Sequence, residues 1–186
     1  MEKSIFLAGV GGQGMQSVGK ELLYAADKAG LTVTYSPLYT FEKRGGLSSA
    51  YVVLSTAERI GSPRKEFHDI VVVMNQYTFD YSKNSVKPGG ALIINSSIVR
   101  DTSGMPDGIS SVELPFLDIA AELGNPKVVS TLILGVVART CGMFPDIAAV
   151  KDTALESLKK KPDMLTLNAA AFDKGVALAE DFLDRR

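Results

Sequence analysis

The stretch LAGVGGQGMQSVGKELLYAA, residues 7–26, decides the fold of this chain. An apolar run enters it from residue 4, glycines interrupt the run, and apolar residues at helical spacing follow over residues 15–29. Gly9, Gly11 and Gly14 fit the G-x-G-x-x-G spacing, which between a strand and a helix is typical of dinucleotide-binding loops. The stretch therefore predicts a strand, a tight turn and a helix, the first unit of an α/β domain.

The rest of the sequence continues this pattern. Gly30 stands where a helix cap belongs, and we expect strands at 31–36, 47–55, 69–75, 90–97 and 111–116. From residue 116 the spacing becomes helical, with helices at 116–123, 127–141, 146–160 and from 165 onward. We therefore expect residues 1–186 to form a single Rossmann-like α/β domain, with a mainly parallel sheet flanked by helices and a helical C-terminal third.

Composition and charge exclude several classes of protein. The chain has 186 residues, of which 46% are hydrophobic, enough for one compact core. Its 20 Lys and Arg are balanced by 21 Asp and Glu, so no basic excess points to nucleic acid. The apolar start is too short for a signal peptide, and the longest nearly apolar run, 128–138, is well below the roughly 20 residues that cross a bilayer. We expect a cytoplasmic protein with no nucleic-acid and no membrane partner.

Two single residues of reactive types do not indicate a catalytic or metal site. Cys141 is the only cysteine, which excludes an internal disulfide and an iron–sulfur cluster held by this chain alone, since such a cluster needs about four thiolates. It lies in an apolar helix and is expected to be buried. His68 is the only histidine, and the sequence offers it no orienting partner, so we expect a structural or solvent-facing role. No catalytic residue and no metal ligand are predicted.

The glycine loop has several interpretations. A dinucleotide site needs an acidic residue about 20 residues beyond the glycines, at the end of the second strand. That region reads TYSPLYT, and the next acid, Glu42, comes only after it. No Gly-Lys-Ser/Thr sequence ends the loop, so it is not a Walker phosphate loop either. A purely structural turn and an anion site at the N-terminus of the following helix both stay open.

A second glycine loop lies within LYTFEKRGGLSSAYVVLS, residues 38–55. In a doubly wound sheet, the loops after the first and second strands open at the same carboxyl edge, where ligands bind. Arg44 offers a planar guanidinium for a carboxylate or phosphate, while Gly45 and Gly46 allow close backbone approach. The alternative is a turn that carries a solvated charge cluster, including Glu42 and Lys43.

These motifs together resemble the gamma subunit of 2-oxoacid:ferredoxin oxidoreductases, the family that acts on pyruvate, 2-oxoglutarate or ketoisovalerate. The motifs are GVGGQG (9–14), Glu42-x-Arg44-Gly45-Gly46 and Asn168-x-x-Ala171-Phe172-x-x-Gly175. The spacing of ERIGSP (58–63), DIVVVMNQ (69–76) and KPGGALIINSS (87–97) fits as well, so the resemblance covers about residues 4 to 180. One departure is Ser130, where the family often has asparagine.

The resemblance implies a multi-subunit enzyme that decarboxylates a 2-oxoacid with thiamine diphosphate, passes electrons through iron–sulfur clusters to ferredoxin, and releases an acyl-CoA. This chain would act with alpha, beta and probable delta subunits and would not be active alone. The sequence has neither the Gly-Asp-Gly run nor the paired asparagines that hold thiamine diphosphate and Mg²⁺, and it has one cysteine. It is therefore expected to contribute binding and assembly rather than a cofactor of its own.

On this resemblance, we expect the two glycine loops to meet coenzyme A, a substrate anion or a partner subunit. The residues concerned are Gly11, Gly12, Gln13, Gly14, Arg44, Gly45 and Gly46. The first four would supply backbone N–H groups and one amide side chain, and Arg44 would supply positive charge near the diphosphate of coenzyme A or the substrate carboxylate. The 2-oxoacid stays open, with 2-oxoglutarate favoured by the short, unfused type of chain. The rivals are a free-standing nucleotide- or anion-binding α/β module and an NAD-dependent dehydrogenase.

Overall fold

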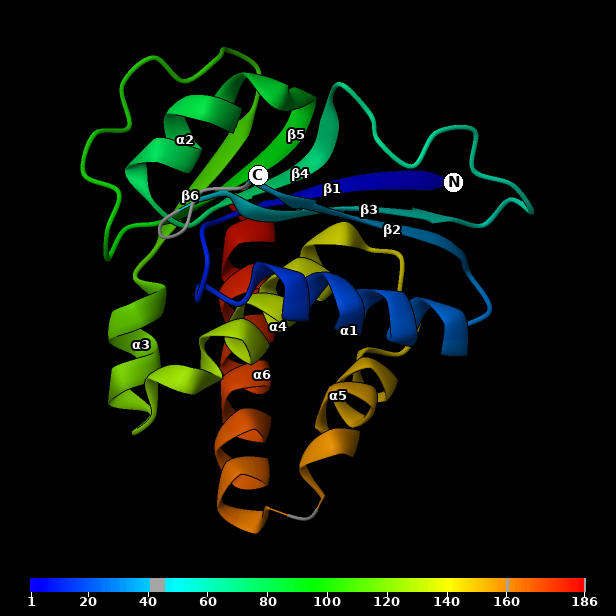
Figure 1. The fold of residues 1–186 in the computed structure, drawn as a ribbon, viewed down its shortest axis with the longest axis vertical. Helices are drawn as coiled ribbons and strands as arrows, with labels where there is room; N and C mark the ends of the chain where they lie inside the picture. The colour runs from blue at the N-terminus through cyan, green and yellow to red at the C-terminus, as the bar shows by residue number, and fades with distance from the viewer. Residues whose placement is uncertain (41–45, 160, 186) are drawn as a thin grey trace.

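A computed structural model describes residues 1–40, 46–159 and 161–185 of the chain. Its strands are β1 (Glu2–Ala8), β2 (Thr32–Tyr39), β3 (Ser48–Ser55), β4 (His68–Val73), β5 (Val86–Asn95) and β6 (Ser110–Leu114). They form one six-stranded sheet in the order β2-β3-β1-β4-β5-β6. Figure 1 shows this sheet nearly edge-on, with helices on both of its faces.

The helices divide unequally between the two faces of the sheet. They are α1 (Met15–Lys28), α2 (Gln76–Ser82), α3 (Phe116–Glu122), α4 (Val129–Cys141), α5 (Ile147–Leu155) and α6 (Pro162–Leu183), with short 3-10 turns η1 (Lys83–Ser85), η2 (Pro126–Val128) and η3 (Glu156–Leu158). Helix α2 packs on one face, and α1, α4 and α6 lie on the other (Figure 1). The α/β class, the flanking helices and the helical C-terminal part agree with the sequence prediction.

The sheet is mainly parallel, as predicted, with one strand in the opposite direction. Strands β1, β4, β5 and β6 pair in parallel, but β3 runs antiparallel to both β1 and β2 and lies between them. Strand β3 therefore separates β1 from β2, the two strands that flank α1. The physical reason is the short connection 40–47, because a parallel pair needs a longer crossover whereas a hairpin joins antiparallel strands. Since β1 and β2 still run in the same direction, their carboxyl ends lie at one edge of the sheet.

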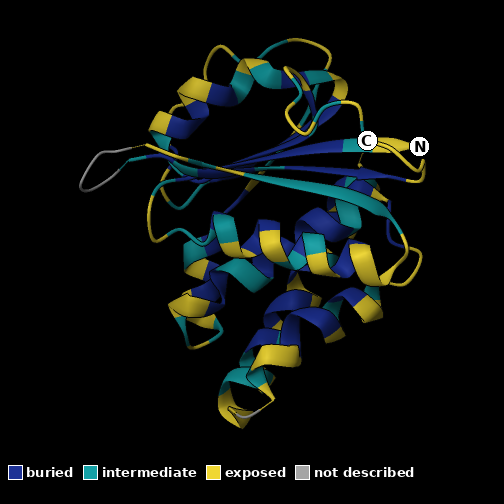
Figure 2. Cartoon of the chain, turned by 45° about the vertical axis from the view of Figure 1, so that its right-hand side comes forward, coloured by how far each residue is buried: buried dark blue, intermediate teal, exposed yellow. Residues whose placement is uncertain are grey.

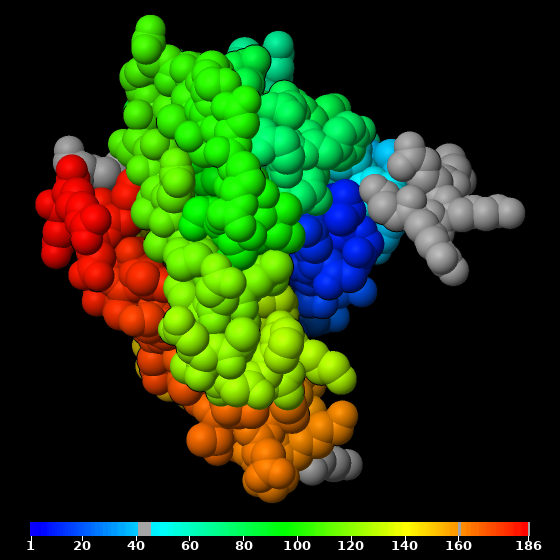
Figure 3. Space-filling view, turned by 90° about the vertical axis from the view of Figure 1, so that its left-hand side faces the viewer, coloured from blue at the N-terminus to red at the C-terminus, as the bar shows by residue number. Residues whose placement is uncertain are grey.

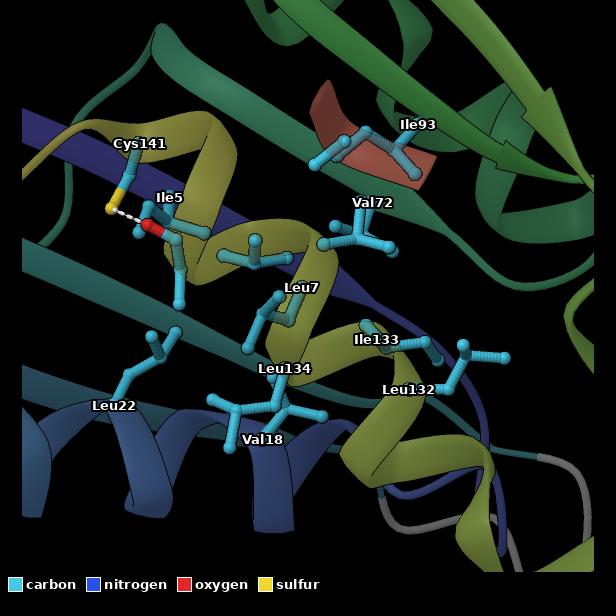
Figure 4. Packing of buried hydrophobic residues seen from close by; sticks show 14 of the residues in the cluster. Ile5, Leu7, Val18, Leu22, Val72, Ile93, Leu132, Ile133, Leu134 and Cys141 are labelled. Carbon is cyan, nitrogen blue, oxygen red and sulfur yellow. Dashed lines mark hydrogen bonds between the residues drawn. The ribbon is translucent and has the colours of Figure 1, made fainter. Parts of the chain in front are cut away.

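The central strands contribute to cores on both faces of the sheet. Along β1, Ile5 and Leu7 point into the larger core and Phe6 points into the smaller one beside Phe79 of α2, as the two-residue period of a strand requires. Figure 4 shows Ile5 and Leu7 with side chains of α1 and α4. Figure 2 shows the same arrangement as dark, buried strands between helices whose outer faces are exposed. Burial on both sides explains why these strands are apolar without alternation.

Helices α4 and α6 approach each other closely through glycines. A methyl group at Gly175 of α6 would collide with the main-chain oxygen of Leu132, and one at Gly135 of α4 would collide with that of Phe172. Next to this contact, the Thr131 hydroxyl donates a 2.5 Å hydrogen bond to Oδ1 of Asn168, which is buried. The residues of the Asn168–Gly175 motif are therefore part of a helix–helix contact.

Several helix ends differ from the sequence prediction. Helix α4 begins at Val129, after the 3-10 turn η2, and α5 ends at Leu155, before η3. Pro162 is the first residue of α6, where its missing N–H costs nothing. Helix α2 was not predicted. Among the described residues, no helix is both long and apolar enough to cross a bilayer.

Cys141 and His68 are both buried. The Cys141 thiol donates to the oxygen of Ala138, and burial raises its pKa to about 11, so it is the inert residue that the sequence predicted. Nδ1 of His68 lies 2.8 Å from the hydroxyl of Ser4, and its ring stacks on Phe6. Burial lowers the pKa of His68 to about 4, aided by the charge of Lys87. Of the two roles expected for His68, structural or solvent-facing, the structure therefore shows the structural one.

Candidate functional site

The loop after β1 leaves the carboxyl edge of the sheet in a tight turn. The N–H of Gln13 donates a 3.1 Å hydrogen bond to the oxygen of Val10, which closes a four-residue turn. Gly12, the third residue of this turn, has φ +91°, and Gly14, the N-cap of α1, has φ +78°. Residues with a side chain rarely adopt such angles, so the backbone itself requires glycine at these two positions.

The described end of the second glycine loop lies directly against this turn. Val10 and Leu47 form an isolated antiparallel bridge, and the N–H of Gly11 donates a 3.3 Å hydrogen bond to the oxygen of Gly46. The expectation that both loops open at one edge of the sheet is confirmed at these residues. Arg44 and Gly45 lie outside the described residues.

The side chain of Gln13 points toward the protein rather than away from it. Its Oε1 accepts hydrogen bonds from the N–H of Val10, at 2.9 Å, and from Nδ2 of Asn75, at 3.1 Å. Its Nε2 donates a 3.4 Å hydrogen bond to the oxygen of Met74. The amide that was expected to meet a ligand is thus already engaged between the glycine loop and the end of β4.

Two backbone donors of the loop are open. The N–H groups of Gly12 and Gly14 have no hydrogen-bond partner among the described residues, whereas the N–H of Gly11 is taken by Gly46. No side chain within the described part of the chain caps α1, so the positive end of its dipole is open as well. Two free donors at a helix N-terminus suit a phosphate or a carboxylate. The described residues of both loops carry no titratable side chain, so they can bind and orient an anion but cannot transfer protons.

Gly11 differs from the two glycines with positive φ. It is exposed, its φ is not positive, and a methyl group built on it would meet no described atom within 4 Å. Neither backbone conformation nor packing against the described residues therefore requires a glycine at this position. Close approach of a ligand or of another chain would require a glycine at this position.

Ser130 lies against the glycine loop from the side of α4. A methyl group at Gly14 would come within 2.9 Å of the Ser130 Cβ. The close contact between the two residues therefore leaves no room for a side chain at position 14. Figure 3 shows the face at which the loop reaches the surface, with the blue N-terminal part of the chain between the green segment around α2 and β5 and the yellow-green segment of α3 and η2. The position at which the sequence departs from the family pattern is thus a packing partner of the loop.

The sequence analysis missed Asn75 and Ser49. Asn75 caps α2: its side chain accepts from the N–H of Thr78, and the Thr78 hydroxyl bonds back to the N–H of Asn75. An asparagine after a buried strand with a threonine three residues later is a capping pattern, which was a usable signal. Ser49 accepts a 3.1 Å hydrogen bond from the N–H of Gly9, and nothing in the sequence indicates this contact. Among the described residues, no group of three or more His, Cys, Asp or Glu side chains is placed to hold a metal ion.

Comparisons with known proteins agree with this architecture. The family model for pyruvate ferredoxin/flavodoxin oxidoreductase matches residues 4–178. The 2-oxoglutarate synthase subunit KorC of Methanocaldococcus jannaschii is 32% identical over 97% of this chain and 96% of its own length. The ketoisovalerate oxidoreductase subunit VorA of Methanothermobacter marburgensis is 31% identical over 98% of this chain. The chain spans only 38% of the length of that relative, and the same share of VorA from Methanothermobacter thermautotrophicus, which is 29% identical.

Solved structures show the same fold. The 2-oxoglutarate:ferredoxin oxidoreductase of Magnetococcus marinus superimposes with a TM-score of 0.87 at 25% identity, over 97% of this chain and 31% of that one. The gamma subunit of a keto/oxoacid ferredoxin oxidoreductase from Geobacter sulfurreducens superimposes with a TM-score of 0.78 at 24% identity, over 96% and 99% of the two chains. Because the family model covers nearly the whole sequence and KorC aligns from end to end, the chain belongs to the pyruvate ferredoxin/flavodoxin oxidoreductase family.

Proposed function

We propose that the chain is the gamma subunit of a multi-subunit 2-oxoacid:ferredoxin oxidoreductase, which converts a 2-oxoacid and coenzyme A to an acyl-CoA and reduces ferredoxin. The end-to-end match to KorC, a subunit of 2-oxoglutarate synthase, supports this role. The Magnetococcus marinus enzyme, whose structure holds 2-oxoglutarate, coenzyme A and succinyl-CoA, supports it too. Alpha, beta and delta subunits would complete the complex.

The residues of this chain do not fit the cofactors of such an enzyme. Its single cysteine is buried and bonded within α4, which leaves no thiolate for an iron–sulfur cluster. The described residues offer no carboxylate cluster for the magnesium ion of thiamine diphosphate. We therefore assign these groups to the partner subunits, and binding and assembly to this chain.

The observation that carries the proposal is the pair of open N–H groups on Gly12 and Gly14 at the start of α1. They suit the diphosphate of coenzyme A or the carboxylate of a 2-oxoacid. Arg44 would add the positive charge that these neutral donors lack, from the loop that meets Gly11 through Gly46. In this arrangement the chain holds the anionic part of a ligand while a partner subunit performs the chemistry.

The geometry favours this role over a free-standing nucleotide-binding module. In doubly wound sheets, nucleotides bind where the chain connections diverge, which here is between the carboxyl ends of β1 and β4. The hydrogen bond between Gln13 and Asn75 spans that position. A ligand of the glycine loop would therefore approach from outside the sheet edge, where a second subunit can also reach it.

The substrate is best tested with 2-oxoglutarate first, because KorC of Methanocaldococcus jannaschii, which is 32% identical and aligns over 96% of its own length, is named for it. Ketoisovalerate is the main alternative, since two further relatives are named for that acid. The decisive experiment is purification of the native protein, followed by coenzyme A-dependent ferredoxin reduction with each 2-oxoacid. Co-purification with chains that carry thiamine diphosphate and iron–sulfur clusters supports the proposal, whereas a lone protein that retains a nucleotide supports the rival module.

Arg44→Ala tests the proposed role of the second loop in the reconstituted complex. Loss of a charge-assisted hydrogen bond of about 1.5–3 kcal/mol should raise the KM for coenzyme A roughly tenfold or more, with subunit assembly intact. Arg59→Ala is the matched control, because Arg59 is an exposed arginine in a different loop. Unchanged kinetics for Arg44→Ala in an intact complex would remove Arg44 from the site.

A further inference from the structure

The amide of Gln13 joins two segments that are distant in sequence, the glycine loop and the end of β4. One oxygen, Oε1, bonds the N–H of Val10 within the glycine loop and also Nδ2 of Asn75, the N-cap of α2. Since Asn75 follows β4 directly, this pair of hydrogen bonds fixes the loop to the carboxyl end of a central strand. The glycine loop, which has no large side chain besides Gln13 and Val10, is thus held to that strand by the amide group of Gln13.

The anchor to which Gln13 is tied is itself rigid. The oxygen of Met74 accepts from Nε2 of Gln13 at 3.4 Å and from Nδ2 of Asn95 at 3.1 Å. Asn95, at the end of β5, is completely buried, and Met74 is buried too. The ends of two parallel strands therefore form a fixed polar base, and buried hydrogen-bonded groups of this kind resist displacement.

The position of Gln13 in the loop gives this anchor a consequence for binding. Gln13 stands between Gly12 and Gly14, whose N–H groups are the open donors. The N–H of Gly14 lies in the peptide plane that follows Gln13, and the N–H of Gly12 lies within the turn that the hydrogen bonds between Gln13 and Val10 close. A glycine-rich loop is conformationally permissive, so without an anchor the two donors would point in varying directions.

From this geometry we infer that Gln13 is a positioning residue, which aims the N–H groups of Gly12 and Gly14 at the anion of the ligand without touching the ligand itself. The identity of the ligand, coenzyme A or a 2-oxoacid, rests on the proposed function. The orientation of the two donors does not, because it is a property of the isolated chain. Preorganised donors bind an anion more tightly than mobile ones because less conformational freedom is lost on binding.

The test compares Gln13→Leu with Gln13→Glu in the isolated chain. Leucine removes both acceptor bonds, whereas glutamate keeps an oxygen that accepts from Val10 and Asn75. We expect the NMR amide signals of Gly12 and Gly14 to move and broaden in Gln13→Leu, and to stay near their wild-type positions in Gln13→Glu. Wild-type glycine signals in Gln13→Leu would overturn the inference, as would equal displacement of the signals in both variants.

Gln16 supplies a matched control. It is half-buried like Gln13, donates a 2.6 Å hydrogen bond to the oxygen of Ser49, and accepts one from the hydroxyl of Tyr35. Gln16→Leu therefore removes two hydrogen bonds of a glutamine, compared with three in Gln13→Leu, but neither of the two is made to the loop. We expect its Gly12 and Gly14 signals to stay as in the wild type, and a displacement equal to that of Gln13→Leu would mean that the effect is one of general stability.

The reconstituted complex then connects the donors to binding. Gln13→Leu should raise the KM for coenzyme A roughly tenfold, equivalent to about 1.4 kcal/mol, with kcat at saturating coenzyme A and subunit assembly preserved. A fall in kcat with unchanged KM would overturn the inference. If the wild-type complex shows no coenzyme A-dependent turnover, the proposed function fails, while the glycine signals of the isolated chain still decide the role of Gln13.

Discussion

The contact between α4 and α6 and the loop after β1 both use glycines, but their surroundings are opposite. At Gly175, a methyl group would collide with the backbone of α4, so the packing of this domain alone requires glycine there. At Gly11, a methyl group would meet no described atom within 4 Å, and the backbone needs no positive φ. The first glycine is explained by the fold, and the second points to something outside it. This difference separates a glycine that the packing of the domain requires from one for which we propose a role in binding.

His68 belongs with the first group. Its ring is buried against Phe6, and its Nδ1 faces the hydroxyl of Ser4. Neighbouring Asp69 accepts the N–H of Ser4 and pairs with Lys87 at 2.9 Å. Nδ1 of His68, the N–H and hydroxyl of Ser4, and the carboxylate of Asp69 thus have partners within the chain. Substitution here should change stability, whereas substitution at Gly11 should change binding.

The largest effect is expected for Gly175→Ala. The added methyl group would force α6 away from the oxygen of Leu132, and overpacking of this kind costs about 3 kcal/mol of unfolding free energy. Urea unfolding of the isolated chain measures the loss. Lys174→Ala, on the exposed face of the same helix, should change stability by less than about 0.5 kcal/mol. Equal stability of the two variants would mean that the helices can separate freely.

Gly14→Ala should have the next largest effect. The substitution places a side chain at φ +78° and within 2.9 Å of the Ser130 Cβ, so backbone strain and crowding add to about 2 kcal/mol. If backbone strain alone causes the loss, the double variant Gly14→Ala, Ser130→Gly should be no more stable than Gly14→Ala. If crowding contributes, the double variant should recover part of the unfolding free energy. Unfolding of the single and double variants by urea therefore separates the two causes.

A smaller, pH-limited effect is expected from His68. Its pKa is about 4 in the folded protein, against about 6.5 in an unfolded chain. Between these values the unfolded state binds more protons, so stability is fully present above about pH 6.5 and falls as the pH is lowered toward 4. The urea midpoint should therefore decrease from pH 7.5 to pH 5.5. In His68→Gln this part of the pH dependence should disappear, and an unchanged slope would assign it to other groups.

The sequence predicts the elements of the fold well because they depend on local patterns. The apolar runs of β1, β4 and β5 and the helical spacing of α1 follow from residues near one another. The place of β3 was missed because the hydrophobic pattern does not encode strand order, although the short connection between β2 and β3 favours an antiparallel pair. The partners of Gln13 were missed for a similar reason, since Asn75 is 62 residues away and reaches the loop only because β1 and β4 are neighbours. Glycine spacing therefore predicts where the site lies, but tertiary contacts decide which groups of the loop are free.

The smallest effect on stability, and the most informative one for function, is expected for Gly11→Ala. Alanine meets no described atom there and needs no unusual backbone angle, so the isolated chain should unfold within about 0.5 kcal/mol of the wild type. Gly61→Ala is the matched control, since Gly61 is equally open and exposed but lies far along the chain from both glycine loops. In the reconstituted complex, only Gly11→Ala should raise the KM for coenzyme A or weaken subunit assembly. A loss of stability in isolated Gly11→Ala would place the reason for this glycine inside the domain, and would make Gly11 and Gly175 alike.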